Sequence, residues 1–241
     1  MFIVVKVDVK WYACAMNTKC VKVENFSQFK LAFLGDSITY GADGYGIPSV
    51  MAYPLPTLVQ LELQARESVN LGISGSTLCT AIDTRPDAYD HCPFVNRVDD
   101  VPLDSDIVCV FGGVNDFEFG FPLGALNDEV DDTIYGALNG IVNQLQAKYP
   151  NAYLLLFTPM GLADERIARD PATYKFTELV DAIKQVGAKY GVDVVDLYND
   201  SGWKETEMLS DKSDGLHPSQ YYMARHVAPM IANFIRANYR K

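Results

Sequence analysis

The sequence lacks any long uninterrupted run of apolar residues. Its longest runs, such as residues 107–111 and 152–157, are far shorter than the roughly 20 residues that cross a bilayer as a helix. The first residues do not form the apolar region of a signal peptide either, because Lys6, Asp8 and Lys10 interrupt them. The sequence therefore predicts no membrane span and, by default, a cytoplasmic location. Export would require a leader that precedes these residues.

Positive charge is also scarce. Lysine and arginine together number 20 against 31 aspartates and glutamates in 241 residues, which gives a formal net charge of −11. Such a chain repels a phosphate backbone, so nucleic acid is not an expected partner. The remaining composition, with 49% hydrophobic and 12% aromatic residues, is that of a folded protein with a core and not of a disordered chain.

Cysteine is too sparse and too irregularly spaced for a zinc site or a disulfide framework. The five cysteines are an odd number, and no two of them stand in a Cys-x-x-Cys pattern. Reduced thiols and no bound metal are therefore the expectation. A single bridge between Cys79 and Cys92 across a loop stays open at this point.

From residue 30 onward, short apolar runs alternate with longer amphipathic stretches. This alternation is typical of βα units around a parallel sheet with helices on both faces, and it predicts one three-layer α/β/α domain over residues 30–241. The runs are continuously apolar, as expected of strands that are covered on both faces. The five predicted strands are residues 30–34, 68–71, 106–111, 152–157 and 192–197.

Three further segments carry apolar residues at helical spacing. Helices are expected over residues 131–149 and 172–190, with Gly191 as the left-handed residue that ends the second of them. A last helix is expected to begin at Pro218, because proline is favoured at the first helical position. Pro229 lies inside this helix and predicts a kink there.

The first 29 residues do not follow this rhythm. Valines alternate with charged residues at positions 5 to 9 and again at 21 to 23, and Asn17 and Thr18 interrupt the pattern between them. The segment is predicted to be a β-hairpin-like extension and not an independent domain. We favour an extension of the sheet edge, and the alternative is an arm that forms a homodimer.

Small and polar residues follow the first predicted strand. In open α/β sheets, binding sites form outside the carboxyl ends of the strands. Gly35, Asp36 and Ser37 would place a hydroxyl nucleophile at a strand-to-helix turn, beside backbone N–H groups that can bind an oxyanion. The ordinary alternative is a helix N-cap, because serine and aspartate are favoured there too.

Two other segments offer hydrogen-bond donors in similar places. Gly75 follows the second predicted strand, where glycine lets the backbone approach a ligand closely, and Asn115 follows the third strand with a side-chain amide. A tight glycine turn and an Asx-turn are the ordinary explanations of these two segments.

Histidine occurs only three times. His217 lies three residues after Asp214 in a turn before the last helix, so the carboxylate can bond to one ring nitrogen and leave the other to accept a proton. His226 falls on the last helix and His91 in a polar loop, which leaves His217 as the best candidate for a general base. Taken alone, an Asp-x-x-His pair is more often a local cap.

Together and in this order, Gly35-Asp36-Ser37, Gly75, Gly113-x-Asn115-Asp116 and Asp214-x-x-His217 resemble the four blocks of the SGNH hydrolases, also called the GDSL esterase/lipase family, over about residues 30–238. The resemblance implies a flavodoxin-like sandwich with a mostly parallel five-stranded sheet. It implies Ser37 as nucleophile, His217 as general base and Asp214 as the acid that orients it. It also implies an oxyanion hole made by the N–H groups of Ser37 and Gly75 and the Asn115 side chain, and no metal or cofactor.

The substrate is an ester of a small molecule on this interpretation. A short acyl group on a carbohydrate or another small polar molecule is favoured, because no long apolar patch suits an oil surface. A lysophospholipase or thioesterase activity, and a non-catalytic carbohydrate-binding module on the same fold, are the alternatives. Residues near the nucleophile, near Asn115 and before Asp214 are candidates for substrate binding, although several could instead close the core; they are Asp36, Tyr40, Tyr45, Phe117 and Trp203.

Overall fold

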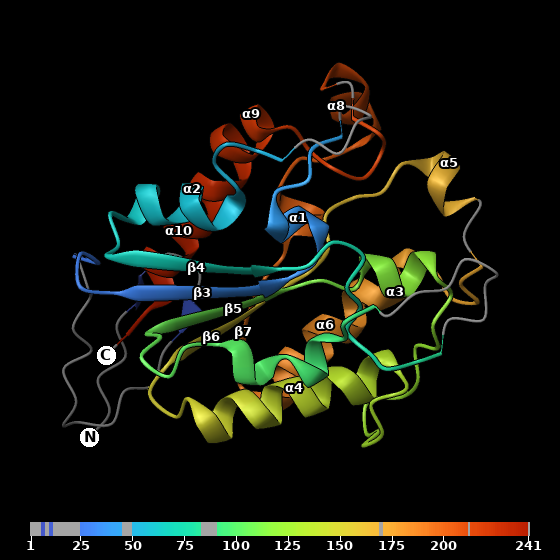
Figure 1. Cartoon of the computed structure of the whole chain (residues 1–241), viewed down its shortest axis with the longest axis horizontal. Helices are drawn as coiled ribbons and strands as arrows, with labels where there is room; N and C mark the ends of the chain where they lie inside the picture. The colour runs from blue at the N-terminus through green and yellow to red at the C-terminus, as the bar shows by residue number, and fades with distance from the viewer. Residues whose placement is uncertain are drawn as a thin grey trace.

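A parallel sheet of five strands organises the chain (Figure 1). The computed structural model describes residues 6–7, 10–11, 25–44, 50–82, 91–168, 171–211 and 213–240. The strands of the sheet are β3 (Lys30–Gly35), β4 (Glu67–Gly72), β5 (Ile107–Phe111), β6 (Tyr153–Phe157) and β7 (Asp193–Val195). Their spatial order is β4-β3-β5-β6-β7, which is the flavodoxin order. The predicted α/β fold is confirmed.

The central strands are buried and the edge strands are not. Every residue of β5 is buried, because helices cover both faces of the sheet there. Every residue of the edge strand β4 is half-buried or exposed, so the expectation of a strand covered on both faces is wrong for it. The last strand is shorter than predicted, because Asp196 accepts a hydrogen bond from the Asn199 N–H (3.2 Å) and caps α7 (Leu197–Asp200).

Helices lie on both faces of the sheet. α2 (Leu55–Leu63) and α10 (Ala228–Asn238) cover one face, and α4 (Ile134–Lys148) and α6 (Phe176–Tyr190) the other (Figure 1). The shorter helical segments are α1 (Ser37–Tyr40), α3 (Val114–Glu118), α5 (Asp164–Ile167), α8 (Glu205–Ser210) and α9 (Gln220–Tyr222), with the 3₁₀ turns η1 (Phe94–Asn96) and η2 (Val98–Asp100).

Local caps set the ends of the predicted helices. α4 begins later than expected, because the Thr133 hydroxyl accepts the Gly136 N–H (3.1 Å). α6 likewise begins only at Phe176, where the Lys175 N–H donates to the Glu178 carboxylate (2.8 Å). Its end at Gly191 is as predicted, with φ +65° in the left-handed region.

The C-terminal helical region differs from the single kinked helix expected from Pro218. It begins with α9 after Ser219, whose hydroxyl accepts the Tyr222 N–H (3.1 Å). A π-helical turn, η3 (Met223–Val227), then leads into α10. Pro229 has no N–H to donate to the preceding turn, and the wider turn is one way to accommodate its ring. The interruption near Pro229 therefore takes the form of a π turn.

The described part of the N-terminal segment forms a separate ladder. β1 (Lys6–Val7) pairs antiparallel with β2 (Lys10–Trp11), and neither strand belongs to the five-stranded sheet. The chain thus reverses direction before Asn17, and for these four residues the expected extension of the sheet edge is wrong. The second predicted arm at residues 21–23 lies outside the described residues, and the dimer arm stays a prediction.

The core is continuous across the sheet. Phe33, Phe111 and Phe157 lie on adjacent strands with ring centroids 5.6 to 6.3 Å apart. Cys79 is buried as a free thiol, so the Cys79–Cys92 bridge that the sequence left open is not formed. No helix within the described residues is long and apolar enough to cross a membrane.

Candidate active site

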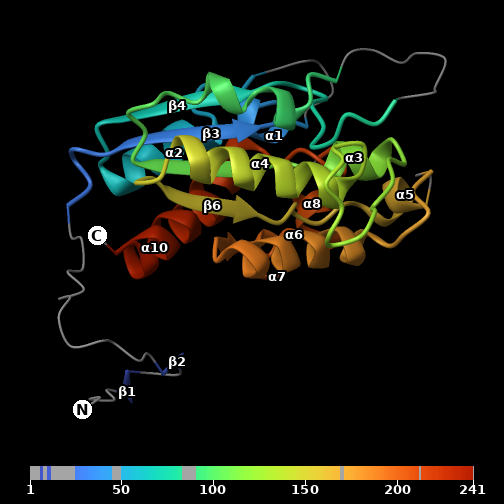
Figure 2. The same cartoon turned by 90° about the horizontal axis from the view of Figure 1, so that it is seen from below.

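The candidate residues meet at the carboxyl ends of the strands. Ser37 begins α1 directly after β3, Gly75 follows β4, and Asn115 lies on α3 after β5. The chain leaves β3 toward one edge of the sheet and β5 toward the other, so this is the switch point where ligands bind in such sheets. Figure 2 shows α1 and α3 together at the end of the sheet toward which the strand arrows point.

Ser37, His217 and Asp214 form one hydrogen-bonded chain. The Ser37 Oγ lies 2.8 Å from the His217 Nε2, although the two residues are 180 positions apart in the sequence. The His217 Nδ1 lies 2.8 Å from the Asp214 Oδ2 on its other side. The structure thus brings together all three residues of the predicted nucleophile, base and acid.

The turn that carries the acid and the base is held by its own hydrogen bonds. The Asp214 Oδ1 accepts the N–H groups of Leu216 (2.9 Å) and His217 (2.8 Å), and the Ser213 hydroxyl donates to the His217 carbonyl (2.8 Å). Partial burial alone would raise the pKa of Asp214, but the hydrogen bonds from the His217 ring and the backbone outweigh it and lower the pKa to about 2. The carboxylate is therefore ionised at neutral pH.

Gly44 lies against this turn from the segment after α1. A Cβ atom at Gly44 would lie 2.6 Å from the His217 carbonyl oxygen and 2.8 Å from the Asp214 nitrogen. Both distances are shorter than real contacts allow, so the close approach requires glycine. The sequence analysis missed this residue, because its partners are backbone atoms some 170 residues further along the chain.

The sequence predicts three N–H donors to an oxyanion, from Ser37, Gly75 and Asn115, and the structure gives the local conformation of each. The Ser37 amide is the first of α1 and has no acceptor within the helix. Gly75 has φ +75°, a conformation that favours glycine. The Asn115 Nδ2 donates one hydrogen to the Ser76 carbonyl (2.8 Å), which leaves its second hydrogen for a ligand.

Asp116 fixes the helix that carries Asn115. Its buried carboxylate accepts the N–H groups of Leu78 (2.9 Å) and Cys79 (3.1 Å), which belong to the segment after Gly75. Burial raises the pKa of Asp116 to about 6, although these backbone hydrogen bonds act in the opposite direction. The segment after Gly75 and helix α3 are thus tied together.

The chain matches the GDSL-like lipase/acylhydrolase family over residues 33–224, a span that includes Ser37, Gly75, Asn115, Asp214 and His217. The chain belongs to this family. It is therefore a hydrolase of ester bonds, and the predicted resemblance is confirmed.

Solved structures share the fold of this GDSL-like hydrolase. A protein from Lactobacillus plantarum is 28% identical with a TM-score of 0.73, covering 88% of this chain and 99% of its own. A lipase/acylhydrolase from Enterococcus faecalis is 23% identical (TM-score 0.62; 89% and 98% covered). Est24, a carbohydrate acetylesterase from Sinorhizobium meliloti, is 19% identical (TM-score 0.67; 88% and 100% covered). No curated protein matches the chain.

Two of the aromatic residues predicted to bind substrate lie in the core of the hydrolase. Phe117 is 2% exposed and packs edge-on against Phe176, with ring centroids 5.0 Å apart. Trp203 is 1% exposed and packs against Tyr222 at 4.6 Å. Phe117 therefore presents almost no surface to a substrate, whereas Trp203 also lines a cavity of about 310 Å³ together with Leu162 and Met208. Both stay predictions as substrate contacts. Tyr40 is 44% exposed at the end of α1 and stays a candidate. Tyr45 lies outside the described residues.

The structure places Asp36 at the N-cap of α1. Its side chain is buried, and its Oδ1 accepts the Ile38 N–H (2.9 Å), so it caps α1 behind the nucleophile. The helix-cap alternative thus holds for Asp36, while Ser37 lies one residue further on with its hydroxyl on His217. Burial is the main cause that raises the pKa of Asp36 to about 7, and its Oδ2 is buried without a partner.

Replacing Asp36 is expected to change how stability depends on pH. A carboxyl whose pKa rises from 3.8 to about 7 on folding contributes stability that is complete below about pH 4 and is lost as the pH rises through about 7. Asp36→Asn keeps an acceptor for the Ile38 N–H but does not titrate. From pH 4.5 to 8, the free energy of unfolding of the variant relative to wild type should rise by about 2–4 kcal/mol.

Urea unfolding at several pH values measures this difference. Asp214 does not disturb the comparison, because its lowered pKa changes stability only below about pH 4. The negative charge of Asp116 is one of the causes that raise the pKa of Asp36, so these two carboxyls titrate together in wild type. Parallel pH profiles for the variant and wild type would show that Asp36 is not the titrating group.

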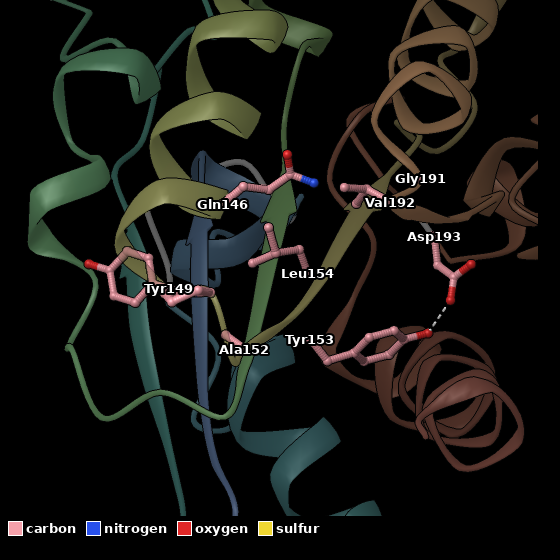
Figure 3. A pocket seen from close by; sticks show the side chains of 9 residues that line it. Gln146, Tyr149, Ala152, Tyr153, Leu154, Gly191, Val192 and Asp193 are labelled. Carbon is pink, nitrogen blue, oxygen red and sulfur yellow. Dashed lines mark hydrogen bonds between the residues drawn. The ribbon is translucent and has the colours of Figure 1, made fainter. Parts of the chain in front are cut away.

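A cavity of about 360 Å³ lies at the opposite end of the sheet, beside the first residues of β6 and β7 (Figure 3). Its polar side chains are already bonded within the protein. Tyr153 donates to Asp193, Gln146 donates to the Tyr190 carbonyl (3.1 Å), and Tyr149 donates to the Val101 carbonyl (2.6 Å). Three of the side chains that line this cavity are thus held by hydrogen bonds within the protein.

Proposed function

We propose that the hydrolase cleaves a carboxylic ester through an acyl-enzyme on Ser37. The unbroken hydrogen-bonded chain from Ser37 through His217 to Asp214, with 2.8 Å at each link, carries this proposal. The Ser37 Oγ attacks the ester carbonyl carbon while the His217 Nε2 takes its proton, and the alcohol leaves with that proton. Water then gives a proton to His217, attacks the acyl group, and releases the acid and free Ser37.

The electrostatics of the acid support this role. Because the pKa of Asp214 is lowered to about 2, its carboxylate is charged throughout the neutral range. It holds a proton on the His217 Nδ1, which leaves the Nε2 lone pair directed at the Ser37 hydroxyl. It also stabilises the imidazolium that forms when His217 takes the proton.

The three N–H donors would stabilise the negative oxygen of the tetrahedral intermediates. They are the Ser37 and Gly75 amides and the free hydrogen of the Asn115 side chain. Each such donor in a serine hydrolase contributes roughly 3 kcal/mol to the transition state, or about two to three orders of magnitude in rate. The negative charge is created only during the reaction, so these contacts raise kcat more than they lower KM.

We further propose a short acyl group on a carbohydrate or another small polar molecule. Phe94 packs closely against Gly112, and Leu78 and Leu179 pack against Gly113, in the segment just before Asn115. In this proposal the acyl chain extends toward these buried side chains, which favours acetate over long chains. The carbohydrate acetylesterase Est24 shares this fold, so the architecture is compatible with such a substrate.

A series of p-nitrophenyl esters from acetate to decanoate tests the acyl length, and an acetylated sugar tests the alcohol. We expect kcat/KM to be highest for acetate or butyrate and to fall with longer chains, because the buried side chains that pack against Gly112 and Gly113 would block longer chains. A maximum at decanoate would instead favour the lysophospholipase or thioesterase alternative. Ser37→Ala measured beside each ester reports the hydrolysis that does not depend on the site.

A further inference from the structure

Arg97 is an almost completely buried cation beside the candidate oxyanion hole. Its side chain donates to the carbonyl oxygens of Gly35 (3.1 Å), Leu71 (2.8 Å) and Cys92 (2.9 Å) and to the Ser76 hydroxyl (2.8 Å). The residue is 8% exposed, and burial lowers the pKa of its guanidinium. Since a guanidinium stays charged in proteins, these four acceptors are what make its burial tolerable.

The acceptors of Arg97 lie on the segments that carry the site. Gly35 is the last residue of β3, two positions before Ser37, and Leu71 is next to the end of β4, four positions before Gly75. A planar guanidinium with five N–H donors in fixed directions can hold several such carbonyls at set distances from one another. One side chain thus joins the ends of the two strands from which the nucleophile and the first glycine donor leave.

Ser76 connects Arg97 to two of the three oxyanion donors. Its hydroxyl accepts from Arg97 and donates to the Cys92 carbonyl, and its carbonyl accepts the Asn115 Nδ2 (2.8 Å). Its own N–H donates to the Ile73 carbonyl (3.1 Å), which closes the turn that holds Gly75 at φ +75°. Ser76 is fully buried, so it does not itself touch a substrate.

We propose that Arg97, acting through Ser76, positions the oxyanion hole by fixing the Gly75 amide and the Asn115 side chain relative to Ser37. Both are positioning residues in this scheme. The inference rests on the proposed function, because it assigns a purpose to donors that only an ester hydrolase of this mechanism uses. A displacement of about 1 Å in such donors is enough to reduce turnover, while substrate binding in the ground state depends little on them.

Kinetics of three variants test the proposal. We expect Ser76→Ala to lower kcat for p-nitrophenyl acetate about tenfold and Arg97→Met about a hundredfold, with KM within about twofold of wild type. Arg97→Lys should fall between them, because an ammonium reaches fewer of the carbonyls. Arg66→Met is the matched control: this arginine is exposed and pairs with Asp104 at the other end of the sheet, so kcat should not change.

A double-mutant cycle separates a positioning role from general loss of stability. In an Asn115→Ala background one of the positioned donors is already absent, so Ser76→Ala should cost at most about threefold in kcat instead of tenfold. Equal losses in both backgrounds, or a lower melting temperature with kcat unchanged, would overturn the inference. Because Ser76→Ala removes only one hydroxyl, this cycle remains informative even where Arg97→Met does not fold.

The same data distinguish failure of the inference from failure of the proposed function. If Asn115→Ala alone keeps the wild-type kcat, the oxyanion hole as proposed does not exist and the proposed function fails with it. If Asn115→Ala has a strongly reduced kcat while Ser76→Ala and Arg97→Lys keep the wild-type kcat, only the inference about Arg97 and Ser76 is wrong.

Discussion

Ser37→Ala is expected to lower kcat for ester hydrolysis by about four to six orders of magnitude. The substitution removes the oxygen that attacks the carbonyl and leaves His217 with no hydroxyl to deprotonate. In serine hydrolases, removing the nucleophile alone lowers kcat about as much as removing the whole triad. The remaining rate acceleration then comes only from the oxyanion hole and from substrate binding. KM should change little, because the donors that bind the carbonyl oxygen stay in place.

Two measurements check this result together. The first is turnover of p-nitrophenyl acetate by wild type and variant, after equal melting temperatures have shown that both proteins are folded alike. The second is the intact mass after treatment with a fluorophosphonate, which should add one adduct to wild type and none to Ser37→Ala. Ser105→Ala is the control, since this buried serine lies before β5 at the far end of the sheet. A Ser37→Ala protein that turns over at the wild-type rate would eliminate the acyl-enzyme mechanism.

Asp214→Asn should lower kcat by about four orders of magnitude at neutral pH while leaving the fold intact. The asparagine oxygen can still accept the N–H groups of Leu216 and His217, so the turn is kept. Its NH₂ group, however, replaces the oxygen that faces the His217 Nδ1. The imidazole proton must then move to Nε2, where it points at Ser37. The Nε2 atom then has no lone pair with which to accept the hydroxyl proton.

Nitrogen NMR of the histidine ring reads the tautomer directly and separates this cause from misfolding. We expect the proton on Nδ1 in wild type and on Nε2 in Asp214→Asn. Asp193→Asn is a matched control, because Asp193 also accepts from a side chain, that of Tyr153, but at the opposite end of the sheet. An Asp214→Asn protein with full activity would show that Asp214 does not orient the base.

The fold and the centre of the site could be predicted because their signals are local. Buried strands are continuous apolar runs, and Ser37, Gly75 and Asn115 stand a few residues after them. The strand order places those ends side by side, so residues that are far apart in the sequence could be predicted to lie close together. The Asp214–His217 pair spans three positions and forms within one turn.

Other residues carried no such signal. Arg97 bonds mainly to backbone carbonyls, and any residue type can supply those, so no pattern of side chains indicates its role. The burial of Phe117 and Trp203 was not predicted, because aromatic residues near a site close a core as readily as they bind a ligand. The premature end of the last strand depends on a single cap at Asp196, which competes with strand formation.

The loop between α3 and α4, residues 122–133, separates the residues of the site into two groups along the sequence. Ser37, Gly75 and Asn115 precede this loop, whereas Asp214 and His217 follow it. Neither fragment obtained by opening the chain there contains a complete set of reacting groups. Ester hydrolysis by a mixture of the two fragments would therefore report their reassociation, because activity requires the Ser37–His217 contact to form again.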